Sequence, residues 1–175
     1  MEIDWREMIW GQFGASTDML ENAVVTCPED VWSEPLEKLQ WQERNVAGFW
    51  YVVYHTLFWL DFYLTDPPTD FVPRPPFTLD ELDPTGMLPE RVYTKDEMLQ
   101  YLHECRRKCH DTIMSMNDKE AREPCGLDWL PVTRAELLLY NLRHVQHHVG
   151  QLNLLLRQRI GSAPRYVIRA GVFRL

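Results

Sequence analysis

One segment, residues 134–160, constrains the fold of this chain more than any other. Apolar side chains recur in it every three or four residues, at Leu138, Leu142, Val145, Val149, Leu152 and Leu156. This spacing predicts a long helix with one face in a core. A second stripe beside the first includes His144 and His148, so the same helix should direct two imidazoles into the interior.

The spacing of this histidine pair suits a metal ion. Side chains four residues apart lie on one side of a helix, with Cβ atoms about 5–6 Å apart, so both rings can reach one ion. Burying polar groups without partners costs about 1–3 kcal/mol each, so the pair needs a partner. His147 and His144 form an alternative pair, but His148 lies nearer the middle of the apolar face and is preferred. A hydrogen-bonded core cluster without metal is the other interpretation.

His55 is the candidate third ligand. It lies in residues 46–64, which are apolar nearly all round and predict a buried helix. A single histidine in such a segment is more often a core residue bonded to a neighbour, but a histidine pair on another inward-facing helix favours a shared site. Three imidazoles with an open position form a reactive metal site. Zinc, nickel, manganese or ferrous iron could occupy it, because imidazole separates these metals poorly.

These residues also resemble a known family. One histidine in the second helix, followed by His-xxx-His-x-Gly-Gln-Leu in the last long helix, is similar to the DinB-like (YfiT-like) metalloenzymes; here the residues are His55, His144, His148, Gly150, Gln151 and Leu152. The resemblance extends from about residue 5 to about residue 160. It implies a four-helix bundle in up-down-down-up order, a divalent metal on the three histidines, and, for some members, a low-molecular-weight thiol as cosubstrate.

The remaining pattern predicts an all-α single domain over residues 1–175. Capping boxes, in which a polar N-cap precedes a glutamate by three residues, begin at Asp4, Thr94 and Thr133. The four predicted helices cover about 5–25, 46–64, 95–116 and 134–160. Residues 65–93 are rich in proline and predict a largely extended crossover between the second and third helices, which must run the length of the bundle if those helices are parallel. Residues 117–132 are expected to form a loop, and about 161–175 an extended tail.

Composition excludes several classes of function. The net charge of −8 argues against a nucleic-acid surface and against binding to an anionic membrane. The N-terminus lacks the basic and apolar parts of a signal peptide, and no apolar run reaches membrane length, so we expect a cytoplasmic protein. The four cysteines are then expected to be unpaired, with Cys105 and Cys109 in the core. The many aromatic residues of 46–64 suggest a homodimer contact.

The sequence therefore predicts a divalent-metal-dependent enzyme that acts on a small-molecule substrate. The metal would activate a thiol or water nucleophile, for thiol transfer or hydrolysis. Val145 follows His144, so the His-Glu-x-x-His pattern of zinc peptidases is absent. No general acid or base is identified. The alternative function is a non-catalytic binding module for a small apolar ligand or a protein partner, with a structural metal or none.

Overall fold

The chain is all-α, as the sequence predicts. The computed structural model describes residues 4–34, 48–84 and 88–171. Within these ranges there are six α-helices, two 3-10 turns and no β-strand. The four long helices are α1 (Trp5–Thr26), α3 (Gly48–Tyr63), α4 (Lys95–Ser115) and α6 (Arg134–Ile160), and the two short ones are α2 (Glu29–Trp32) and α5 (Asp118–Ala121). The second predicted helix begins at residues 46 and 47, which lie outside the described residues.

Local capping explains where the long helices begin and end. Thr94 and Thr133 each form the predicted capping box, accepting a hydrogen bond from the backbone N–H three residues on. Asp4 caps α1 through the N–H of Arg6. Gly161 ends α6 in the left-handed conformation, at φ 73°, which favours glycine. The short helix α5 lies inside the predicted loop 117–132; a single turn is too short to show a periodic pattern.

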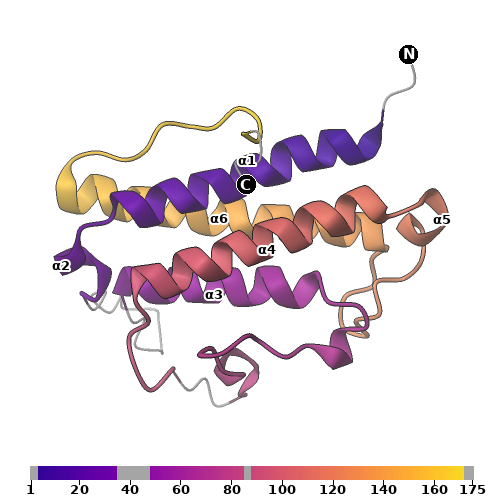
Figure 1. Cartoon of the computed structure of the whole chain (residues 1–175), viewed down its shortest axis with the longest axis horizontal. Coiled ribbons are helices and arrows are strands. Elements are labelled where there is room, and N and C mark those ends of the chain that lie inside the picture. Colours follow the sequence, from indigo (N-terminus) through magenta and orange to yellow (C-terminus); the bar gives the residue numbers. More distant parts are fainter. Residues whose placement is uncertain (1–3, 35–47, 85–87, 172–175) are drawn as a thin grey trace.

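The long helices lie side by side, and α1 and α3 each pack against both α4 and α6 (Figure 1). The chain runs through α3 and α4 in the same direction, and through α1 and α6 in the opposite one (Figure 1). Contacts at the helix ends agree with this, because Lys95 at the start of α4 donates to the Cys27 carbonyl oxygen, whereas Arg6 donates to the Met116 carbonyl oxygen at the other end. No helix in the described part of the chain is long and apolar enough to span a membrane.

The crossover between α3 and α4 is packed against the helices. Its described residues contain two 3-10 turns, η1 (Pro68–Asp70) and η2 (Asp80–Leu82). Phe71 and Phe77 are buried, and the ring of Phe77 stacks on Tyr101 of α4 with centroids 4.5 Å apart. Phe71 lies edge-on to Phe58 of α3, at 5.1 Å. The crossover thus covers aromatic side chains of α3 that the sequence had suggested for a homodimer contact.

The tail after α6 returns along α1 (Figure 1). The Ala170 N–H donates to the Gly11 carbonyl oxygen, at 2.8 Å, and the Gly171 N–H donates to Asp18, also at 2.8 Å. A Cβ on Gly14 would lie 2.6 Å from that of Ala170, so a side chain there would displace the tail.

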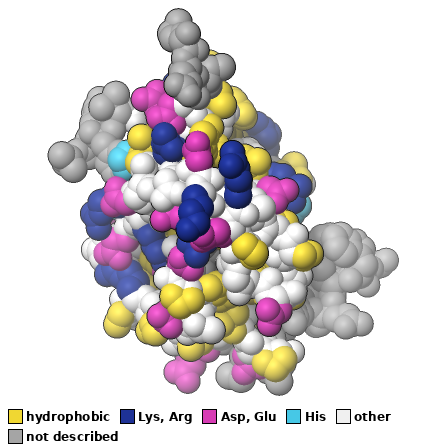
Figure 2. All heavy atoms as spheres, turned by 90° about the vertical axis from the view of Figure 1, so that its right-hand side faces the viewer, with side chains coloured by type: hydrophobic (Ala, Val, Ile, Leu, Met, Phe, Trp, Pro, Cys, Tyr) yellow, Lys and Arg dark blue, Asp and Glu magenta, His cyan; other side chains and the backbone are white. Residues whose placement is uncertain are grey.

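Two further features of the structure are the state of the cysteines and the distribution of surface charge. All four cysteines are buried and free, including Cys105 and Cys109, as predicted. Figure 2 shows the face on the α5 side of the molecule, where acidic and basic side chains are interspersed. Among the described residues, both signs of charge therefore lie side by side on that face.

Candidate metal centre

The structure brings the three predicted histidines together. His55 is on α3, and His144 and His148 lie one turn apart on α6, which packs against α3. The Nε2 atom of His144 lies 3.3 Å from that of His55 and 3.1 Å from that of His148. One ligand atom from each ring falls within 4.8 Å of the others. Among the described residues, this is the group of histidine, cysteine and acidic side chains close enough to share an ion.

The two distances that meet at His144 fit neighbouring ligands of one ion. Zinc lies about 2.0–2.1 Å from an imidazole nitrogen, so two such ligands stand about 2.9 Å apart at a right angle and about 3.3 Å apart at a tetrahedral angle. The observed separations of 3.1 and 3.3 Å fall between these limits or at the upper one. Histidine nitrogens without protons repel one another at this distance, and a cation between them removes that repulsion. A proton on one Nε2 would instead make a hydrogen bond between two of the rings, as in a core cluster without metal.

A carboxylate holds the ring of His55. The Nδ1 atom of His55 lies 2.7 Å from Oε2 of Glu81, which is in the 3-10 turn η2 of the crossover. The same oxygen accepts a hydrogen bond from the indole Nε1 of Trp59, at 3.0 Å. A proton on Nδ1 then leaves the Nε2 lone pair of His55 facing His144.

An amide holds the ring of His148. The Nδ1 atom of His148 lies 2.7 Å from Oε1 of Gln151, three residues further along α6. The Nε2 of Gln151 lies 3.2 Å from Nε2 of His147, which stands beside the three-histidine group and outside it. Nδ1 of His144 is buried and has no hydrogen-bond partner among the described residues. The three rings are therefore oriented by a carboxylate, an amide and packing alone.

Burial keeps the α6 histidines neutral. Desolvation, followed by the charges of the neighbouring histidines, lowers the pKa of His144 from 6.5 to about 3. The same causes lower the pKa of His148 to about 4. Burial by itself raises the pKa of the Glu81 carboxyl. The hydrogen bond with His55 and the charge of that ring lower the pKa, and the net value lies below the ordinary 4.5. Neutral imidazoles are the form that binds metal.

Comparison with known families covers most of the chain. The family model described as the DinB superfamily matches residues 12–152, a range that includes all three histidines. The chain belongs to the DinB superfamily. No curated protein and no solved structure matches it significantly. The family resemblance predicted from the histidine motif is thereby confirmed.

Glu81 is the residue of this DinB-superfamily site that the sequence did not predict. It lies 26 residues from His55 in the proline-rich crossover, among other acidic residues. The spacing of Tyr51, His55 and Trp59, four residues apart on α3, was the available signal. It places two side chains with polar hydrogens beside His55, and such a cluster calls for an acceptor.

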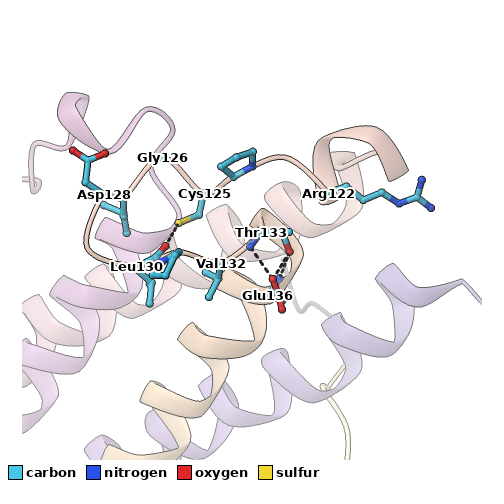
Figure 3. A pocket seen from close by; sticks show the side chains of 11 residues that line it. Arg122, Cys125, Gly126, Asp128, Leu130, Val132, Thr133 and Glu136 are labelled. Atoms are coloured by element: carbon cyan, nitrogen blue, oxygen red, sulfur yellow. Dashed lines mark hydrogen bonds between the residues drawn. The ribbon is translucent and has the colours of Figure 1, made fainter.

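A cavity elsewhere in the DinB-superfamily chain has a structural explanation. It has a volume of about 470 Å³ and lies in the connection between α5 and α6 (Figure 3). Its lining includes none of the three histidines. The thiol of Cys125 donates to the Leu130 carbonyl oxygen, at 3.2 Å, and Thr133 and Glu136 form the capping box of α6 (Figure 3). These polar groups are thus used to hold the loop.

Proposed function

We propose that this DinB-superfamily chain is a divalent-metal-dependent enzyme whose ion is held by His55, His144 and His148. The observation that carries the proposal is the convergence of the three Nε2 atoms, with separations of 3.1 and 3.3 Å to the central His144. Family membership and the metal-compatible cluster both support it. The metals that suit the site are zinc, nickel, manganese and iron.

The site's own residues favour nucleophile activation. A bound divalent ion lowers the pKa of a thiol or water beside it and so favours the nucleophilic anion. Three neutral imidazoles cancel none of the ion's charge and leave coordination positions open. Tyr63 is buried, with its ring edge-on to His144 at 6.3 Å, and limits the access of water on that side. We propose transfer of a low-molecular-weight thiol to a small-molecule substrate, or hydrolysis, as the reaction.

The same proposal includes the architecture that holds the site. The directions and contacts of the long helices support a four-helix bundle in up-down-down-up order, within one domain over residues 1–175. A homodimer and a cytoplasmic location stay predictions. Light scattering at micromolar concentration tests the first, and a monomer would contradict it.

Metal content tests the proposed function directly. Elemental mass spectrometry of the untagged protein should find about one divalent ion per chain, because the three histidines form one site. His144→Ala and His148→Ala should each abolish it. His103→Ala is the matched control, since His103 is exposed and bonded to Glu21, and should retain the ion.

A different result would favour the alternative function. Folded protein that contains no ion, and takes up no zinc, nickel or manganese, would contradict the enzyme proposal. It would favour a non-catalytic binding module for a small apolar ligand or a protein partner.

A further inference from the structure

We propose that Glu81 is the positioning residue of the metal centre, and that it binds the crossover to the ion's ligands through His55. Its carboxylate would fix the His55 ring and add the negative charge that three neutral imidazoles lack. The inference rests on the proposed function, because it concerns the same ion.

The contacts of Glu81 show a carboxylate held in one place. A single oxygen, Oε2, receives both the Nδ1 of His55 at 2.7 Å and the Nε1–H of Trp59 at 3.0 Å. The Glu81 side chain is 6% exposed. Two ring donors from successive turns of α3 therefore point at one buried oxygen, which is a far more specific arrangement than a surface ion pair.

The hydrogen bond decides which nitrogen of His55 can bind a cation. A carboxylate that accepts the Nδ1 proton fixes that tautomer and makes Nε2 the more basic ligand atom. Nε2 of His55 faces Nε2 of His144, at 3.3 Å. Glu81 therefore acts on the ion through the His55 ring, from the Nδ1 side, and does not touch the ion.

Charge balance also favours this role. In the described part of the chain, the hydrogen bonds of the three rings include one carboxylate, that of Glu81, beside the neutral amide of Gln151. Burying a carboxylate is costly unless a positive charge lies near it. A divalent cation on the opposite nitrogen of His55 would provide that charge across the ring.

A simple buried ion pair is the competing explanation. In it, His55 carries protons on both nitrogens, pairs with Glu81 and cannot bind metal. The two explanations predict opposite signs for the effect of removing the carboxylate. Loss of a positioning residue weakens metal binding, whereas loss of a competing ion pair leaves binding unchanged or strengthens it.

Zinc affinity of the full chain distinguishes them. The dissociation constant is measured by competition with a chromophoric chelator for the wild type, Glu81→Gln and Glu81→Ala. We expect Glu81→Ala to weaken binding by about 10–100-fold, the usual effect of removing the partner of a metal-bound histidine. Glu81→Gln should weaken it less, since its amide oxygen still accepts the Nδ1 proton but carries no charge.

Glu90 provides the matched control. It is an exposed glutamate in the same crossover, so Glu90→Gln and Glu90→Ala should bind zinc as the wild type does. Circular dichroism establishes that each variant is folded, and if Glu81→Ala is not, Glu81→Gln decides the question. Wild-type or tighter binding by the folded Glu81 variants would overturn the inference and leave the metal centre intact. A folded wild type that takes up none of zinc, nickel and manganese would overturn both proposals.

Discussion

The two sides of the candidate metal centre are built differently. On the α6 side, the partner of His148 is Gln151, an exposed neutral amide three residues away on the same helix. On the crossover side, the partner of His55 is Glu81, a buried carboxylate 26 residues away. The first contact follows from helical spacing alone, whereas the second exists only when the crossover is packed onto α3.

This difference indicates where the site is strong and where it depends on the rest of the fold. Once α6 is formed, its helical geometry alone sets the spacing of the two imidazoles and of their amide partner. The third imidazole has its tautomer fixed only after Phe71 and Phe77 have brought the crossover onto the long helices. Variants that separate the two sides should therefore affect them unequally.

The largest effect is expected from detaching the crossover. Phe77 is buried against Tyr54, Tyr93 and Tyr101, and Phe77→Ala should cost about 3–5 kcal/mol of unfolding free energy, the usual range for a core phenylalanine. Zinc affinity should also fall in the folded variant, because Glu81 is held less firmly. Denaturant unfolding and chelator competition measure the two effects.

Leu79→Ala is the control for this variant. Leu79 is in the same crossover but 48% exposed, so its truncation should change stability by less than about 1 kcal/mol. A Phe77→Ala protein with full zinc affinity would show that the crossover side of the site forms independently of crossover packing, and would remove the contrast between the two sides.

Acid should destabilise the metal-free protein through the α6 side. The folded-state pKa values of His144 and His148, about 3 and about 4, lie below the ordinary value of 6.5. The unfolded chain therefore binds more protons, and the free energy of unfolding falls as the pH drops from about 7 toward 5. The contribution is complete above the unfolded pKa and is lost toward the folded values.

Chemical denaturation at a series of pH values, with a chelator present, measures this dependence. The range from pH 7 to 5 lies above the ordinary carboxyl pKa values, so the histidines dominate it. His144→Gln should reduce the slope of stability against pH. An unchanged slope would show that the neutral, buried state of His144 is not what makes acid destabilising.

The sequence predicted the α6 side well because its signals are local. Leu138 to Leu156 set the helix, the Thr133 capping box set its start, and the spacing of His144 and His148 set the pair that the structure brings together. The same reasoning predicted all four long helices. It also predicted that His55 belongs to the site, since that histidine interrupts an otherwise apolar segment.

The crossover side could not be predicted in the same way. Glu81 lies in a 3-10 turn of three residues, which has no periodic pattern, and its contact with His55 depends on tertiary packing. Nearby acidic residues such as Asp80 and Asp83 looked equivalent in the sequence. What distinguishes Glu81 is its position once Phe77 is buried, and propensities do not encode that position.

The smallest effect is expected from the helical partner of His148. Gln151→Ala removes the acceptor of the Nδ1 proton, but Gln151 is exposed, so water can take its place. We expect zinc binding to weaken by only about two- to fivefold, less than the range usual for partners of metal-bound histidines. Gln158→Ala, an exposed glutamine near the end of the same helix, should have no effect. If Gln151→Ala weakened zinc binding as much as Glu81→Ala, the neutral and charged partners would be equivalent. Orientation of the rings would then govern affinity on both sides of the centre, and the negative charge of Glu81 would contribute little.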